Sequence, residues 1–170
     1  MLAESFSTPV AIRVAAENPT NLKGLILCAG FATSPVSGLS RMLGWFLASV
    51  LTRMPLPDAV MRARLTGTDA PATLLLQVRD AVASVNANVL AARLRAILKC
   101  NVCAELTRIA IPVLYLQAAQ DRLVRSRCLD EIQRMKPDVR SIIMNGPHLL
   151  LQANPDEAAR IVADFCRALS

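Results

Sequence analysis

Residues 22–31 (LKGLILCAGF) and 112–119 (PVLYLQAA) decide the fold class, because both are apolar along almost their whole length. Residues 139–145 (VRSIIMN) form a third run that is shorter and more mixed. Continuous apolar strands are typical of a parallel sheet that is covered on both faces. We therefore expect these three segments to be buried parallel strands.

Helical patterns alternate with the predicted strands. Residues 9–18 follow Thr8, a possible N-cap, and begin with a proline. Residues 125–135 are amphipathic, and residues 155–169 have Asn154 as N-cap and a proline at their first position. Strands that alternate with helices in this way predict a doubly wound α/β architecture.

The segment between the first two predicted strands differs from the rest of the chain. Residues 38–97 show helical periodicity and no convincing strand, and prolines and a glycine divide them into a few helices. Residues 41–99 contain eight basic and three acidic residues, so they carry most of the net charge of +6. We therefore expect a core built from residues 1–37 and 98–170, with a basic helical insert between its two parts.

The composition of the 170 residues argues against several classes of protein. Hydrophobic residues make up 54% of the chain, which is enough for a globular core. Aromatic residues are only 4% and the arginines are dispersed, so no nucleic-acid partner is expected. The longest apolar stretch, between Arg41 and Arg53, is shorter than the about 20 residues that cross a bilayer, so we expect no membrane span.

Cysteine and histidine usage argues against a disulfide framework and a metal centre. The five cysteines are an odd number, and residues 1–4 lack the basic start and apolar run of a secretory signal, so a cytoplasmic protein with free thiols is expected. Cys100 and Cys103 have C-x-x-C spacing but no second pair and no neighbouring histidine. We expect two half-buried thiols at a helix end there, and neither a metal nor a cofactor.

His148, the only histidine, is the first candidate for chemistry. It follows the third predicted strand, and loops at the carboxyl ends of parallel strands are where α/β sheets place functional groups. Asp121 follows the second predicted strand and is able to hold a histidine in the required tautomer. Both residues also have structural interpretations: a packed or surface histidine, and an aspartate that caps the helix beginning near Arg125.

Ser5 is the candidate nucleophile. In Ala3-Glu-Ser-Phe-Ser it has small residues two positions before and after it, and a predicted helix follows. A nucleophile on a sharp strand-to-helix turn needs such small neighbours, although the usual pattern has glycine at both places. Ser7 is a competing candidate with a poorer fit, because Pro9 lies two residues after it.

Together, these segments resemble the α/β-hydrolase superfamily, whose catalytic residues follow the order Ser, Asp, His. Ala3-Glu-Ser-Phe-Ser resembles its nucleophile turn, Asp121-Arg-Leu-Val its acid loop and Gly146-Pro-His-Leu-Leu-Leu its histidine loop. The resemblance implies an α/β fold: a truncated hydrolase core with a parallel sheet, which carries residues 38–97 as a helical cap. It also implies a serine esterase that cleaves small-molecule acyl esters of short to medium length without a cofactor.

The resemblance further implies roles for individual residues. Ser5 would attack the ester carbonyl, His148 would act as base and then as acid, and Asp121 would orient His148. The backbone N–H of Phe6 would supply one oxyanion donor. The residues expected to contact substrate are Trp45, Phe46 and Leu149.

The chain begins at the nucleophile turn, whereas the superfamily has several strands before it. Only Leu2 and Ala3 are expected to remain of the strand that leads to Ser5, and the loop that supplies the second oxyanion donor is missing. We expect an exposed sheet edge that favours a homo-oligomer. The alternative is a catalytically weak or inactive hydrolase fragment that acts as an interaction protein. The basic cap also permits an acidic partner such as an acyl carrier protein.

Overall fold

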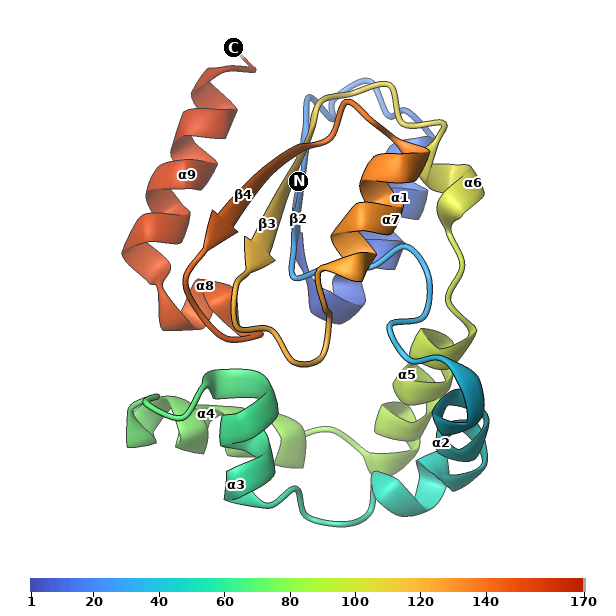
Figure 1. The fold of residues 1–170 in the computed structure, drawn as a ribbon, viewed down its shortest axis with the longest axis vertical. Coiled ribbons are helices and arrows are strands. Elements are labelled where there is room, and N and C mark those ends of the chain that lie inside the picture. Colours follow the sequence, from blue (N-terminus) through green and yellow to red (C-terminus); the bar gives the residue numbers. More distant parts are fainter. Residues whose placement is uncertain (170) are drawn as a thin grey trace.

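The structure, a computed structural model, describes residues 1–169. Four parallel strands form one sheet in the order β1-β2-β3-β4. The strands are β1 (Leu2–Glu4), β2 (Leu25–Cys28), β3 (Val113–Ala118) and β4 (Arg140–Met144). The three predicted strands are confirmed, and the short strand expected before Ser5 is β1. Helices connect successive strands, so the fold belongs to the predicted α/β class (Figure 1).

Helices cover both faces of the sheet (Figure 1). Alternate residues of β2 point to opposite faces, with Leu25 and Leu27 in one apolar layer and Ile26 and Cys28 in the other. The first layer is closed by α1 (Thr8–Ala16), α6 (Cys103–Leu106) and α7 (Arg127–Met135), and the second by α8 (Leu150–Ala153) and α9 (Pro155–Arg167). The core therefore consists of two apolar layers separated by the sheet.

The expectation that all three predicted strands are buried on both faces is wrong for β4, because one face of β4 is exposed. Ile142 packs in the layer that α9 closes, but Ile143 on the opposite face is 70% exposed. Arg140 and Ser141 are exposed as well. The reason is position: β4 is an edge strand, and α7 contributes to the layer that contains Leu27 and Tyr115 of the two central strands. The mixed composition of this segment reflects that open face.

The helical insert lies apart from the sheet, at the opposite end of the molecule from the last turns of the C-terminal helix, which is red (Figure 1). Its elements are α2 (Gly38–Leu51), α3 (Asp58–Met61), the π-helical turn η2 (Arg62–Thr66), α4 (Ala72–Ala83) and α5 (Ala87–Lys99). Pro57 and Pro71 precede α3 and α4, and Gly67 ends η2 with a φ of +86°, so these breaks fall where the sequence predicts them. The break before α5 carries no proline or glycine. There Asn86 caps the helix through its side chain.

The helices of the insert are short. Within residues 1–169, no single helix is both long and apolar enough to cross a membrane. The pair α4 and α5 meets the length and composition test only when the two helices are taken together, across a bend of 99°. Helix α2 is apolar but has 14 residues.

Cys28, Cys100, Cys103 and Cys128 are free thiols. Burial raises the pKa of the Cys28 and Cys128 thiols above the ordinary value. Cys100 and Cys103 are half-buried at the end of α5 and the start of α6, and burial raises the pKa of Cys100 to about 11. A raised thiol pKa disfavours both nucleophilic attack and metal binding, because both need the thiolate.

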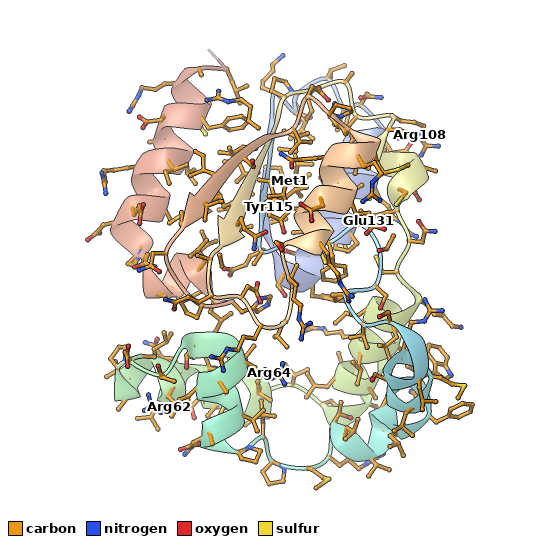
Figure 2. The ribbon with its side chains drawn as sticks, in the orientation of Figure 1. Met1, Arg62, Arg64, Arg108, Tyr115 and Glu131 are labelled. Carbon is orange, nitrogen blue, oxygen red and sulfur yellow. The ribbon has the colours of Figure 1, made fainter. Side chains whose placement is uncertain are left out.

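Tyr115, in the centre of β3, joins the sheet to the loop that follows β2 (Figure 2). The side chain is fully buried, and its hydroxyl donates to the carbonyl of Gly30 at 2.7 Å. A buried carbonyl that loses its donor lowers stability, because it can no longer reach water. Tyr115 therefore stabilises a loop that borders the Ser5 turn.

We predict that Tyr115→Phe lowers the free energy of unfolding by about 1–2 kcal/mol, because the ring stays packed while the Gly30 carbonyl loses its partner. Urea denaturation followed by circular dichroism measures this difference. An unchanged free energy of unfolding would mean that the hydrogen bond contributes nothing to the fold.

We also predict slow alkylation of Cys100 at pH 8. A pKa of about 11 in place of 9.0 leaves about a hundredfold less thiolate. Iodoacetamide labelling, read by peptide mass spectrometry, should be at least about tenfold slower at Cys100 in the native protein than in urea, since lower thiolate content is partly offset by higher nucleophilicity. Equal rates in the two states would contradict the burial of this thiol.

Candidate active site

Ser5, His148 and Asp121 are far apart in the sequence and meet at the carboxyl edge of the sheet. Ser5 Oγ lies 2.7 Å from His148 Nε2, and Nδ1 of the same ring lies 2.7 Å from Asp121 Oδ2. His148 is only 3% exposed, and the Asp121 side chain is fully buried. The structure therefore brings the three predicted catalytic side chains into one continuous chain of hydrogen bonds.

The contacts of Asp121 determine which tautomer His148 adopts. Asp121 Oδ1 accepts the backbone N–H groups of Leu123 at 2.7 Å and Val124 at 2.8 Å, while Oδ2 faces the imidazole. A carboxylate only accepts hydrogen bonds, so Nδ1 of His148 carries the ring proton. The other nitrogen, Nε2, is left to accept the hydroxyl proton of Ser5. This is the tautomer that a general base requires.

The turn between β1 and α1 holds Ser5 in a strained backbone conformation. Ser5 has a φ of +51°, in the left-handed region that residues other than glycine rarely adopt. It begins η1 (Ser5–Ser7), a single 3₁₀ turn that leads directly into α1. Strain of this kind costs about 1–3 kcal/mol and persists only where the surroundings enforce it. Ala3, the small residue two positions before Ser5, is buried in β1.

Ser7, the competing nucleophile, has a different role. Its hydroxyl accepts the N–H of Glu4 at 2.9 Å and donates to the carbonyl of the same residue at 2.8 Å. Both hydrogen-bonding functions of the hydroxyl thus close the turn around Ser5. Ser7, which stands where the usual pattern has glycine, therefore stabilises the turn. Ser5 is the serine that faces His148.

Thr8 supports the turn in a way that the sequence does not reveal. It is predicted to cap the following helix, but the N-cap is Ser7, and Thr8 is a fully buried residue inside α1. Its hydroxyl donates to the Ser5 carbonyl at 2.7 Å and accepts the Phe31 N–H at 3.2 Å. This link depends on Gly30, since a Cβ there would lie 2.7 Å from Thr8 Cγ2.

Glu4 is a second supporting residue that no sequence pattern singles out. It directly precedes Ser5, and its carboxylate accepts the backbone N–H of Leu151 at 3.3 Å and the side-chain amide of Gln152 at 2.9 Å. Leu151 and Gln152 belong to α8, which follows His148. Glu4 therefore ties the turn of the nucleophile to the loop of the base.

The loop that carries His148 is shaped by Gly146 and Asn154. Gly146 has a φ of +157°, and a Cβ at this position would lie 2.7 Å from Asn154 Nδ2. That amide donates to the Asn145 carbonyl at 2.5 Å. Asn154 is the N-cap of α9, as predicted, and its side chain reaches back across the loop. The glycine is thus required by both its backbone conformation and the close approach of Asn154.

The helical insert touches the catalytic loops from the other side. The Leu149 N–H donates to the Leu65 carbonyl at 2.9 Å, and Arg64 Nη1 donates to the Arg122 carbonyl at 3.2 Å. Figure 2 shows Arg64 at the boundary between the insert and the core. Leu149, which is predicted to contact substrate, therefore lies where the insert meets the His148 loop.

Phe6 follows Ser5 in the first turn of η1. The first N–H groups of a helix have no partner inside that helix, so the Phe6 N–H is free of a partner within η1, as the predicted oxyanion donor requires. The guanidinium of Arg93, on α5, lies 5.8 Å from the centroid of the Phe6 ring. The side chain of Phe6 thus links the nucleophile turn to the insert.

Trp45 and Phe46, the other predicted substrate contacts, are not brought to the catalytic residues. Phe46 is 72% exposed on α2. Trp45 is half-buried, with the ammonium group of Lys99 4.1 Å from its ring centroid. Trp45 lines a cavity of about 1000 Å³ whose lining includes neither Ser5 nor His148. The large apolar residues of α2 turn away from the core because small residues form its packed face.

Comparison with known proteins identifies the fold. No model of a known protein family matches the sequence, and no curated protein matches it. A thermophilic esterase from Thermogutta terrifontis superposes with a TM-score of 0.82 at 19% identity, over 99% of this chain and 64% of that chain. An enol-lactonase from Burkholderia xenovorans superposes with a TM-score of 0.79 at 18% identity, over 98% and 64%. A lipase-esterase related protein from Clostridium acetobutylicum gives 0.77 at 18% identity, over 96% and 64%.

These likenesses concern the fold, because the identities are 18–19%. The chain spans 64% of the length of each of the three structures. Nearly the whole chain takes part in the superpositions, including the helical insert and all four strands. The chain therefore has the α/β-hydrolase fold.

Proposed function

We propose that this chain carries the catalytic residues of a serine esterase that cleaves short to medium acyl esters. The observation that carries the proposal is the pair of 2.7 Å contacts that run from Ser5 through His148 to Asp121. A histidine with only a packing role does not need a hydroxyl on one ring nitrogen and a buried carboxylate on the other. Structures of similar fold include proteins named as an esterase and an enol-lactonase, which favours acyl-ester chemistry.

In the first step, Ser5 Oγ attacks the ester carbonyl carbon while His148 Nε2 accepts the hydroxyl proton. The electrons of the carbonyl double bond move to the oxygen, which accepts a hydrogen bond from the Phe6 N–H. The carboxylate of Asp121 stabilises the imidazolium that forms, since it is buried 2.7 Å from Nδ1. The left-handed backbone of Ser5 keeps Oγ in position for the attack.

The tetrahedral intermediate then collapses. The imidazolium of His148 donates its Nε2 proton to the leaving alkoxide, the C–O bond breaks, and the acyl group stays on Ser5. A water molecule, deprotonated by the same nitrogen, attacks the acyl carbon. His148 finally returns the proton to Ser5 Oγ as the carboxylic acid leaves.

A second candidate function follows from the oxyanion site. Phe6 supplies one donor, and loss of a single oxyanion donor typically lowers kcat by about 10²–10³. With one donor, Ser5 would be activated and become acylated, but turnover would be slow. Such a chain would act as a weak hydrolase or as an acyl-binding interaction protein.

We predict that Ser5→Ala abolishes covalent labelling by a fluorophosphonate probe and removes the hydrolysis of p-nitrophenyl acetate and butyrate. The reason is that the alanine lacks the hydroxyl that contacts His148 Nε2 and forms the acyl-enzyme. Ser84→Ala is the matched control, because it removes an exposed serine hydroxyl at the end of α4, away from the Ser5 turn. This control should still be labelled.

The outcomes of this comparison separate the two candidate functions. Labelling of Ser5 together with ester turnover supports the esterase. Labelling of Ser5 without turnover supports the weak or acyl-binding alternative. Equal ester hydrolysis by the wild type and Ser5→Ala, without labelling of Ser5, would overturn both.

We further predict that Asp121→Asn lowers kcat for p-nitrophenyl butyrate by about 10⁴, while KM changes little. The asparagine amide would donate toward Nδ1 of His148, which places the ring proton on Nε2 and leaves no acceptor for Ser5. Asp138→Asn is the control, since Asp138 is an exposed carboxylate paired with Lys136. A loss of less than tenfold in Asp121→Asn would show that Asp121 does not set the tautomer.

A further inference from the structure

Helix α2 leaves most of its large apolar side chains in solvent. The helix packs against α5 through small residues: Ala48 is fully buried, and a Cβ at Gly44 would lie 3.4 Å from Leu98 Cδ1. The opposite side of the helix, which we call the α2 apolar face, consists of Leu39, Met42, Leu43, Phe46, Val50 and Leu51. Each of these side chains is about half to three-quarters exposed. An apolar stripe of this kind is unusual on the surface of a monomer and marks an interaction site.

Positive charges accompany the α2 apolar face, and negative charges do not. Residues 38–54 and 87–99, which contain α2 and α5, hold no acidic residue. Their cationic residues are Arg41, Arg53, Arg95 and Lys99, together with Arg93, whose guanidinium lies instead at the Phe6 ring of the nucleophile turn. Arg95 and Lys99 lie against the ring of Trp45 at 5.8 and 4.1 Å, so two of these charges sit on the flank of α2 itself.

The position of α2 makes this surface accessible. Figure 1 shows α2 at the periphery of the insert, away from the sheet and from α7 and α9. Arg41 lies in the first turns of α2, and Arg53 follows its last residue, where it donates to Ser49 and Asn88. The apolar face is therefore bounded by a cation at each end of the helix.

This combination fits an anionic lipid surface. A helix of 14 residues is about 21 Å long, and a helix that lies in the plane of a membrane interface buries one apolar side while its cations contact phosphate groups. A second copy of the chain fits less well, because it would bring the cations that flank α2 in one copy against those of the other. An anionic bilayer instead offers both an apolar phase and opposite charge.

We propose that α2 docks this chain onto the surface of an anionic phospholipid bilayer. The α2 apolar face enters the boundary between headgroups and acyl chains. The cations that flank it, Arg41, Arg53, Arg95 and Lys99, contact the headgroup phosphates. The inference goes beyond the proposed esterase function and does not depend on it, because it concerns where the chain binds rather than what it cleaves.

The test uses the complete chain and vesicles of two compositions. One set contains phosphatidylcholine alone, and the other contains phosphatidylcholine with phosphatidylglycerol. We expect cosedimentation with the anionic vesicles, weakened at high salt because headgroup contacts are screened. Trp45 is the only tryptophan, so its fluorescence should shift to shorter wavelength on binding without any label.

Two pairs of variants locate the contact. Phe46→Ser should weaken binding to anionic vesicles by about tenfold or more, while Ile143→Ser, which removes an equally exposed apolar side chain from β4, should not. Arg41→Gln should weaken binding by about fivefold, while Arg160→Gln on α9 should not. All four residues are exposed, and circular dichroism of each variant verifies that it is folded.

Three results would overturn the proposal. The first is no preference for anionic vesicles at low salt, and the second is equal binding by Phe46→Ser and Ile143→Ser. The third is a different occupant of the face. If analytical ultracentrifugation without lipid shows a dimer, and Phe46→Ser dissociates that dimer, then the face binds a second copy of the chain. Binding to soluble polyglutamate in place of vesicles, weakened by Phe46→Ser, would identify an acidic protein. None of these measurements involves ester hydrolysis, so their failure is distinct from failure of the esterase proposal.

Discussion

The left-handed backbone of Ser5 is the constraint on which the rest of the site depends. Its φ of +51° carries a cost of about 1–3 kcal/mol, which neighbouring interactions must offset. The Thr8 hydroxyl, from inside α1, donates a hydrogen bond to the Ser5 carbonyl. The Ser7 hydroxyl closes the turn through two hydrogen bonds to the backbone of Glu4. Without these contacts, Oγ of Ser5 would have no fixed relation to His148.

The parallel sheet explains why distant residues converge. Ser5, Asp121 and His148 follow β1, β3 and β4, whose carboxyl ends share one edge of the sheet. The loop after β2 contributes Gly30, which contacts both Thr8 and Tyr115 and so connects the nucleophile turn to the centre of the sheet. Each of the four strands therefore delivers either a member of the site or a support for it.

Much of this arrangement was predictable from the sequence, because continuous apolar runs mark β2 and β3 and catalytic residues in such folds follow strands. The supporting contacts were not predictable. Glu4 contacts α8, about 150 positions away in the sequence. The choice between Ser5 and Ser7 depends on which hydroxyl is hydrogen-bonded within the turn itself, and the sequence does not show this. The outward direction of Phe46 was also hidden, because periodicity gives the spacing of an apolar stripe but not the side on which it packs.

The hydrogen-bonded chain through His148 is the central claim, and it is open to direct measurement because the protein has one histidine. Proton NMR of protein labelled with ¹⁵N-histidine reports both ring nitrogens without ambiguity. We predict that the proton on Nδ1 resonates far downfield, exchanges slowly with water, and disappears in Asp121→Ala. A ring whose protons exchange freely, with identical shifts in the wild type, Ser5→Ala and Asp121→Ala, would contradict the arrangement of Ser5, His148 and Asp121 described here.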